Sequence, residues 1–288
     1  MGSGDEDYLL GAVAYDPKVV TIWEGFREFF KARDFPFDFV LYSNYERQVE
    51  DLLNGRIHAA WNSPLAWVRA RRLAQANDGS VRALVMRDTD RDLSSVVVVR
   101  EDGAIRTPSD LVGKRVATGA IDSPQATLLP LDAFRDLGMN PGKDFEVVHF
   151  DVGVGLHGDH IGGEREAARA LARGEVEAAC MVDANHLMFS REGTLLPGST
   201  RILVQTNPYD HCNMTVVDTA PTTVTDRFVD LLLEMDYGDA ALRPLLDLEG
   251  LKQWLPGRVS GYDNLERAVD HGRFYSDQGE VTADGYDY

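Results

Sequence analysis

The segment GLHGDHIGGERE, residues 155–166, carries two histidines and an aspartate within four positions. His157, Asp159 and His160 supply imidazole nitrogen and carboxylate oxygen, donors that bind zinc or ferrous iron. His-x-x-His spacing is also frequent by chance, so the spacing alone does not identify a metal site. A helical pattern follows at Glu164, so the segment would lie at the N-terminus of a helix, where a loop can contact a ligand.

Later loops hold further donors of the same kinds. His186 and His211 add imidazoles, and Cys212 adds a thiol that binds metals as the thiolate. In the competing interpretation, these side chains hydrogen-bond an organic ligand or one another. The metal hypothesis predicts Zn²⁺ or Fe²⁺, with the ligands His157, His160, His211 and Cys212. If the protein is an enzyme, the three histidines would serve as ligands or acid–base groups, with Asp159 or Glu164 orienting an imidazole.

Alternating strand and helix patterns are expected to position these residues. In each half of the chain, apolar strands alternate with amphipathic helices in a βαβαβ order, which indicates a parallel sheet. The predicted elements of the first half are strands at 9–15, 37–42 and 56–61 and helices at 19–32 and 44–55. Those of the second half are strands at 113–119, 144–150 and 175–183 and helices at 125–138 and 164–174.

The two halves also share local sequence. LLNGRIHAAW at 52–61 aligns with LARGEVEAAC at 171–180 at the glycine, an aliphatic position and the Ala-Ala pair. This repeat predicts two lobes. We expect the first to comprise 1–95 plus 203–288 and the second 96–202, with a loosely attached polar tail at 275–288.

The bulk composition excludes some partners. The formal charge of −18 argues against binding nucleic acid or anionic membrane surfaces. No run of about 18 apolar residues occurs, so membrane insertion is not expected. The first residues lack the basic and apolar regions of an export signal. The location is therefore open: cytoplasmic as written, or extracytoplasmic if a leader was removed and MGSG is a cloning remnant. Cys180 and Cys212 are expected to be either one disulfide or two buried thiols.

Four stretches carry a family resemblance: YERQVEDLLNGRIHAAWNSPLAWVRA at 45–70, LSSVVVVREDGAIRTPSDLVGKRVAT at 93–118, DSPQATLLPLDAFRDLGMNPGKDF at 122–145 and ALARGEVEAACMVD at 170–183. Their order resembles the phosphonate/phosphite-type substrate-binding proteins of ABC importers. The resemblance implies an α/β, two-lobed type II periplasmic-binding-protein-like fold. Each lobe would be a mainly parallel sheet flanked by helices, with a ligand crevice between the lobes.

The resemblance also implies which residues contact the ligand, because open α/β sheets bind ligands at the carboxyl ends of their strands. One departure from the family concerns the turn AIDSPQAT at 120–127, where the family has a Ser/Thr-rich turn for oxyanions. Ser123 and Thr127 remain, but Pro124 has no N–H to donate and Asp122 would repel an anion. The predicted ligand-binding residues are Tyr15, Asp16, Tyr45, Asn62, Ser63, Ser95, Asp122, Ser123, Gln125, Thr127, His157, Asp159, His160, Asp183, His186, Tyr209 and His211.

Two functional hypotheses follow. In the first, the protein is a solute-binding protein that closes on a small polar or anionic ligand, such as a phosphonate, phosphite or phosphate, and works with an ABC permease in uptake or sensing. In the second, it is a cytoplasmic enzyme on the same fold, using the His/Asp/Cys-rich loops with or without a metal. We favour binding over catalysis, and the identity of the ligand stays open.

Overall fold

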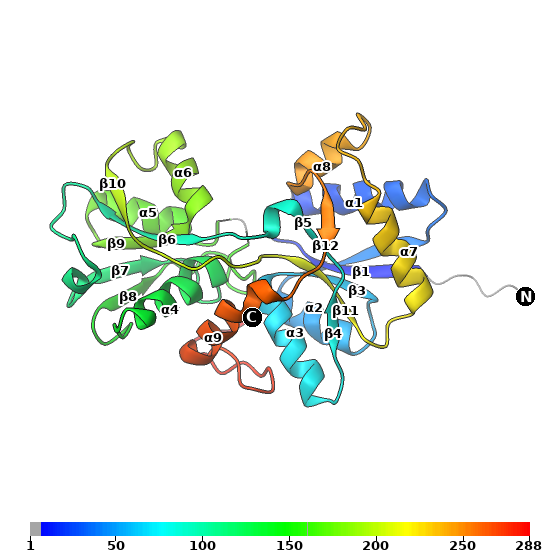
Figure 1. Ribbon diagram of the computed structural model, residues 1–288, viewed down its shortest axis with the longest axis horizontal. Helices are drawn as coiled ribbons and strands as arrows, with labels where there is room; N and C mark the ends of the chain where they lie inside the picture. The colour runs from blue at the N-terminus through cyan, green and yellow to red at the C-terminus, as the bar shows by residue number, and fades with distance from the viewer. Residues whose placement is uncertain (1–6, 160) are drawn as a thin grey trace, which may run out of the picture. The chain divides into compact units, whose positions relative to one another are not determined.

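The computed structural model describes residues 7–159 and 161–288, which form two compact units. Unit 1 contains the described residues up to Arg91 together with Asp210–Ser260 and Asp277–Glu280. Unit 2 contains Asp92–Tyr209, Gly261–Ser276 and Val281–Tyr288. Figure 1 labels the helices and strands of each unit.

Unit 1 is built on a five-stranded sheet in the order β2-β1-β3-β11-β4. The first three of these strands in the chain run parallel to one another, and β11 runs antiparallel to both of its neighbours. The carboxyl ends of β1, β2 and β3 therefore meet the start of β11 at one edge, the carboxyl edge of unit 1. The strands are β1 (Tyr8–Val13), β2 (Phe37–Tyr42), β3 (Ala59–Asn62), β4 (Val81–Ala83) and β11 (Asn213–Val217).

Helices cover both faces of this sheet, because alternate strand residues point to opposite faces. Leu10 and Ala59 belong to the large cluster with α1 and α7, whereas Leu9 and Ala60 pack with Leu52 of α2. The helices are α1 (Lys18–Lys31), α2 (Tyr45–Leu53), α3 (Pro64–Ala76), α7 (Thr222–Leu233) and α8 (Arg243–Glu249). A two-stranded ribbon of β5 (Val85–Arg87) and β12 (Trp254–Pro256) completes the unit.

Unit 2 repeats the plan with the order β10-β6-β9-β7-β8. β7 pairs in parallel with β8 and β9, and β6 is antiparallel to β9 and β10. The carboxyl ends of β7, β8, β9 and β10 thus share an edge with the start of β6, the carboxyl edge of unit 2. These strands are β6 (Ser95–Arg100), β7 (Arg115–Thr118), β8 (Glu146–His149), β9 (Ala178–Val182) and β10 (Thr200–Gln205).

The faces of the second sheet are also separated by strand alternation. Val96 and Met181 pack with α5 and α6, while Val97 and Cys180 pack with Phe134 of α4. The helices are α4 (Leu129–Asp136), α5 (Glu164–Arg173), α6 (Asp183–Glu192) and α9 (Asp263–Gly272). The observed α/β architecture, with a mainly parallel sheet flanked by helices in each unit, agrees with the predicted fold class.

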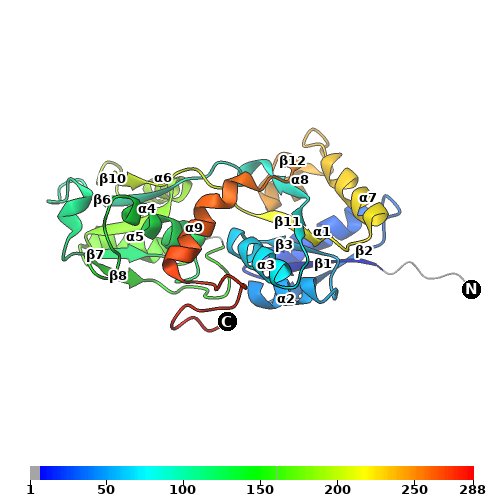
Figure 2. The same ribbon diagram turned by 60° about the horizontal axis from the view of Figure 1, so that its bottom comes forward.

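The position of α9 differs from the sequence-based boundaries, which assigned all of 203–288 to lobe one. In the structure α9 belongs to unit 2, where it lies beside α4 in both views (Figures 1 and 2). Arg267 donates to Asp132 at 2.9 Å and to Asp136 at 2.9 Å, and His271 Nδ1 lies 2.6 Å from Asp132 Oδ1. These polar contacts depend on a helix more than 120 residues earlier, so the local pattern of α9 did not reveal them.

The end of the chain is more ordered than the predicted loose tail. Tyr275 and Val281 form an isolated antiparallel bridge, and Phe274 packs its ring 4.9 Å from that of Tyr286. Tyr286 is buried. The prediction rested on polar and glycine residues and gave too little weight to the aromatic side chains between them.

All four tryptophans of the chain, Trp23, Trp61, Trp67 and Trp254, are buried in unit 1. Among the described residues, no helix has the length and apolar character needed to cross a bilayer.

Candidate functional site

The carboxyl edge of unit 1 gathers several of the predicted ligand-binding residues. Tyr15 and Asp16 follow β1, and Asp16 Oδ1 accepts from the backbone N–H of Lys18 at 2.8 Å, which is a capping role. Tyr45 begins α2 and is buried. Ser63 caps α3 by accepting from Ala66 N at 3.1 Å. Most of these polar groups therefore also start helices.

Asn62 differs from its neighbours because only one side of its amide makes a hydrogen bond. Gln48 Nε2 donates to Asn62 Oδ1 at 2.8 Å and to the carbonyl of Trp61 at 3.0 Å. Asn62 Nδ2 and Gln48 Oε1 are buried and have no hydrogen-bond partner in the structure. An orphaned buried polar atom costs about 1–3 kcal/mol, so this pair is a candidate contact for a ligand. Gln48 was not among the predicted residues, although it lies one helical turn after Tyr45.

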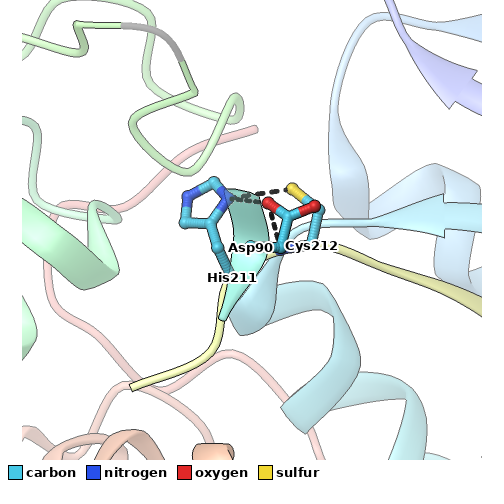
Figure 3. Close-up of side chains that lie close together, drawn as sticks. All are labelled: Asp90, His211 and Cys212. Carbon is cyan, nitrogen blue, oxygen red and sulfur yellow. Dashed lines mark hydrogen bonds and ion pairs between the residues drawn. The ribbon is translucent and has the colours of Figure 1, made fainter. Parts of the chain in front are cut away.

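β11 begins beside Asn62, and the two residues before it, His211 and Cys212, form a cluster with Asp90 (Figure 3). His211 Nδ1 lies 3.1 Å from Cys212 Sγ and 3.4 Å from Asp90 Oδ1. Asp90 and Cys212 are buried, and His211 is half-buried. The backbone fixes the three residues, because His211 N donates to the Asp90 carbonyl at 2.7 Å and Cys212 N donates to Asp90 Oδ1 at 3.3 Å.

The charge of Asp90 is stabilised by Arg87. Arg87 Nε donates to Asp90 Oδ2 at 2.7 Å and Arg87 Nη2 to Asp90 Oδ1 at 2.8 Å, while Arg87 Nη1 contacts Glu249 Oε1 at 3.2 Å. Burial works against the ionised carboxylate, but the guanidinium outweighs it and lowers the pKa of Asp90 from 3.8 to about 2. Neither Arg87 nor Asp90 was predicted, although their i, i+3 spacing beside a strand end is a sequence signal for such a pair.

The turn after β7 forms the corresponding edge of unit 2, and its polar groups bond mainly to the turn itself. Ser123 Oγ accepts from Ala126 N at 3.1 Å, and Thr127 Oγ1 donates to the Ala120 carbonyl at 2.8 Å. Residues Pro124–Leu128 form a single π-helical turn, with the N–H of Leu128 donating to the Ser123 carbonyl at 3.0 Å. The predicted α-helix at 125–138 therefore begins later, at Leu129.

Asp122 is buried beneath the loop that follows β8. Its Oδ2 accepts from the backbone N–H groups of Gly155 at 2.7 Å and His157 at 3.0 Å. Gln125 Nε2 donates to the carbonyl of Gly158 at 2.5 Å, and its Oε1 has no partner in the structure. A Cβ on Gly158 would lie 2.3 Å from Ser123 Oγ, so the close packing of loop on turn requires glycine.

The predicted metal ligands belong to different units of the structure. His157 belongs to unit 2 and is buried, with a left-handed φ of 51°, whereas His211 and Cys212 belong to unit 1. His160 lies outside the described residues. Asp159 is half-buried and closes a turn through its N–H to the Leu156 carbonyl at 2.9 Å. Among the described residues, the metal-binding donor types that cluster are those of Asp90, His211 and Cys212.

Three further predicted residues of unit 2 lie at the start of β6, directly after β9 and after β10. Ser95 Oγ and Tyr209 Oη lie 2.8 Å apart, and burial raises the pKa of the Tyr209 hydroxyl. Asp183 Oδ2 accepts from Ser94 Oγ at 2.8 Å. All of these residues lie at the carboxyl edge of unit 2.

His186 points elsewhere. Its Nε2 lies 2.9 Å from Oγ1 of Thr200, which pairs with Arg100 at the opposite edge of the sheet. Burial lowers the pKa of this imidazole. His186 therefore joins α6 to the start of β10, at the edge of this sheet opposite to the other predicted residues of unit 2.

Cys180 and Cys212 form no disulfide with each other, and both are buried. Burial raises the pKa of the Cys180 thiol, which lies inside β9, so this residue behaves as an apolar side chain.

Several solved structures have the same fold as this chain, and two of them contain different ligands. The chain is similar to PhnD1 from Prochlorococcus marinus in complex with methylphosphonate, with a TM-score of 0.68 at 16% identity over 91% of this chain and 96% of that one. It is similar to XAC2383 from Xanthomonas citri bound to ATP, with a TM-score of 0.68 at 15% identity over 91% and 98%. It is also similar to a binding-protein component of an ABC phosphonate transporter from Pseudomonas aeruginosa, with a TM-score of 0.64 at 12% identity over 93% and 88%.

At these identities the structural likeness establishes the fold, and the sequence family provides the class of protein. The family model described as "ABC transporter, phosphonate, periplasmic substrate-binding protein" matches residues 13–262. This range includes all strands of both sheets except most of β1, and every polar residue of the candidate site described above. The chain therefore belongs to the phosphonate-type substrate-binding protein family of ABC transporters.

Proposed function

We propose that this protein binds a small oxyanion, a phosphonate, phosphite or phosphate, and delivers it to an ABC permease. Membership of the substrate-binding family supports the solute-binding class. The observation that carries the position of the site is the pair of orphaned amide atoms at the carboxyl edge of unit 1, Asn62 Nδ2 and Gln48 Oε1. A ligand oxygen beside Asn62 Nδ2 would accept a hydrogen bond from this amide and offset the cost of burying it.

Two helix N-termini at the same edge favour an anion. Asn44 caps α2 by accepting from Arg47 N at 2.9 Å, and Ser63 caps α3. The side-chain caps satisfy one N–H of each first turn, and the helix dipoles add partial positive charge. Neutral donors of this kind hold an oxyanion without a counter-ion.

The overall charge predicts how the ligand arrives. With a formal charge of −18, the protein repels anions at long range, so binding must depend on short hydrogen bonds. We therefore expect the affinity for methylphosphonate to change little, or to rise slightly, when salt is added.

The test is calorimetric titration with methylphosphonate, phosphite and phosphate. Asn62→Ala removes the free donor and should weaken the ligand that binds by about tenfold or more, the effect of one hydrogen bond to a charged group. The matched control is Asn77→Ala, an exposed asparagine at the end of α3 whose Nδ2 donates to the Leu73 carbonyl at 2.8 Å. The control should bind as wild type does. Absence of binding by all three anions at millimolar concentration, or full affinity in Asn62→Ala, would contradict the proposal.

The same samples separate binding from catalysis. ³¹P NMR spectra of the ligand after prolonged incubation with the protein should be unchanged. A new phosphorus signal that depends on folded protein would instead support the enzyme hypothesis.

Unit 2 offers a separate candidate contact in Gln125, whose Oε1 is a buried acceptor without a partner. A protonated ligand oxygen could donate to it. Gln125→Leu would then reduce affinity more at low pH, where the monoprotonated anion dominates, than at high pH.

A further inference from the structure

The cluster of Asp90, His211 and Cys212 has the donors and spacing of a metal site (Figure 3). We propose that Asp90 Oδ1, His211 Nδ1 and Cys212 Sγ bind a divalent transition metal ion, with zinc as the best match. This proposal does not rest on the oxyanion ligand proposed above.

The distances between donor atoms fit a tetrahedral ion. Zinc bonds of about 2.0–2.3 Å place neighbouring ligand atoms about 3.3–3.6 Å apart. The observed separations are 3.1 Å from Nδ1 to Sγ and 3.4 Å from Nδ1 to Oδ1, and all three donor atoms lie within 4.8 Å of one another. An ion would therefore need only small side-chain movements to replace the Sγ to Nδ1 hydrogen bond with two metal bonds.

The donor types are selective. A thiolate, an imidazole and one carboxylate oxygen suit zinc, cobalt or ferrous iron and do not suit magnesium or calcium, which prefer all-oxygen sites. Three protein ligands leave a fourth tetrahedral position for water or another small group, as in zinc sites that are not purely structural.

The surroundings hold the donors in place. Two hydrogen bonds tie these segments together, one from His211 N to the Asp90 carbonyl and one from Cys212 N to Asp90 Oδ1, so the three ligands come from two segments that are already joined. Asp90 Oδ2 accepts from Arg87 N and Nε, and Oδ1 accepts from Arg87 Nη2 at 2.8 Å and from Cys212 N at 3.3 Å. Arg87 therefore orients the carboxylate, and an ion at Oδ1 would replace the longer of its two hydrogen bonds, the one from Cys212 N. The Arg87 guanidinium lies 5.2 Å from the Trp61 ring centroid, an apolar wall on one side.

Charge gives a further reason for an ion at this position. Two carboxylates, Asp90 and Glu249, share the Arg87 guanidinium in a buried setting. A divalent cation that also displaces the thiol proton of Cys212 would add one net positive charge beside these two carboxylates.

Cobalt substitution tests the proposal with the full chain, prepared without a polyhistidine tag. Addition of Co²⁺ should produce a near-ultraviolet thiolate-to-cobalt absorption band that saturates at one equivalent, and Zn²⁺ should abolish it by displacement. Cys212→Ala should remove the band and weaken zinc binding by about 100-fold or more, because a primary ligand is lost. The matched control is Cys180→Ala, which removes the other buried thiol and should leave the band intact.

Several outcomes would overturn the site. These are no cobalt band in folded wild-type protein, a band that survives in Cys212→Ala, or a band that is lost in Cys180→Ala. If Cys212→Ala does not fold, His211→Ala provides the same test at a less buried position. Its band should disappear or shift while its circular dichroism spectrum stays that of wild type.

Discussion

Each unit buries an aspartate at its carboxyl edge, and the two carboxylates are stabilised in different ways. Asp90 of unit 1 is paired with a guanidinium, which is itself shared with a second carboxylate 159 residues later in the chain. Asp122 of unit 2 accepts from two backbone N–H groups of a loop about 33 residues later. In unit 1 the ion pairs therefore join distant segments of the chain, whereas in unit 2 the Asp122 carboxylate holds a glycine-rich loop through its backbone N–H groups.

This difference explains why the two edges have different capacities for ligands. The Ser123 and Thr127 hydroxyls of unit 2 are bound within their own turn, and Asp122 occupies N–H donors that an external anion could otherwise use. At the edge of unit 1, the Asn62 amide keeps a free donor. We therefore expect oxyanion affinity to depend more on unit 1 than on unit 2.

The largest effect is expected from Asp90→Ala. Removing one partner of a buried ion pair destabilises by about 3–5 kcal/mol, although Glu249 will reduce the loss by retaining Arg87. Urea unfolding measures the change in the free energy of unfolding. The control is Asp226→Ala, an exposed aspartate on α7 of the same unit, which should change this free energy by less than about 0.5 kcal/mol. Equal effects of the two substitutions would show that the ion pair adds no stability.

Asp122→Ala should destabilise by about 2–4 kcal/mol, since two backbone donors lose a charged acceptor. The loss should be local as well as global. Hydrogen exchange at the Gly155 and His157 amides should accelerate before the core strands of unit 2 exchange. Asp136→Ala, at an exposed salt bridge in the same unit, is the control and should cost no more than about 1 kcal/mol. Unchanged exchange at both amides would contradict the inference that Asp122 holds this loop in place.

Alkaline pH compares the cores of the two units. Burial raises the pKa of Tyr8 in unit 1 from 10.0 to about 12, and it also raises that of Tyr209 in unit 2. The folded state keeps the Tyr8 proton that the unfolded chain loses above pH 10, so stability is complete below pH 10 and falls as the pH rises toward 12. The expected loss from Tyr8 is about 3 kcal/mol at most, at 1.36 kcal/mol per pKa unit.

Tyr8→Phe should flatten this alkaline decline, as measured by thermal melts at several pH values. Tyr209→Phe tests the corresponding hydroxyl of unit 2, and it leaves Ser95 Oγ without its tyrosine partner. Tyr288→Phe, at an exposed ring, is the control. An unchanged pH profile in both core variants would mean that neither buried hydroxyl governs alkaline unfolding.

Much of the fold could be predicted because it depends on local patterns. Short apolar runs identified the strands and period-3.6 apolar spacing the helices of both halves, and Asn44 caps α2 as its position before an amphipathic segment predicts. The assignment of α9 to lobe one differed from the structure because the ion pairs of Arg267 join it to α4, and no local pattern encodes such a partner.

The candidate site was less predictable for the same reason. His211 and Cys212 were recognisable as metal-binding donor types, but their partner Asp90 is 121 residues earlier and lies in a short 3₁₀ turn. Asn62 Nδ2 has no partner because Gln48 directs its Nε2 toward Asn62 Oδ1. This orientation depends on packing and cannot be predicted from the residue types. The sequence-based site residues remain proposals, and the titrations above test Asn62 and Gln125 among them.

The location of all four tryptophans in unit 1 has an optical consequence. Intrinsic fluorescence excited in the indole band reports on one unit alone, whereas unit 2 contributes tyrosine emission without an indole of its own. The tryptophan emission of the wild-type chain is thus a probe of unit 1. A shift in emission on adding a metal or an oxyanion would come from indoles of unit 1, and a tryptophan introduced at Phe189 in the core of unit 2 would report on the other unit.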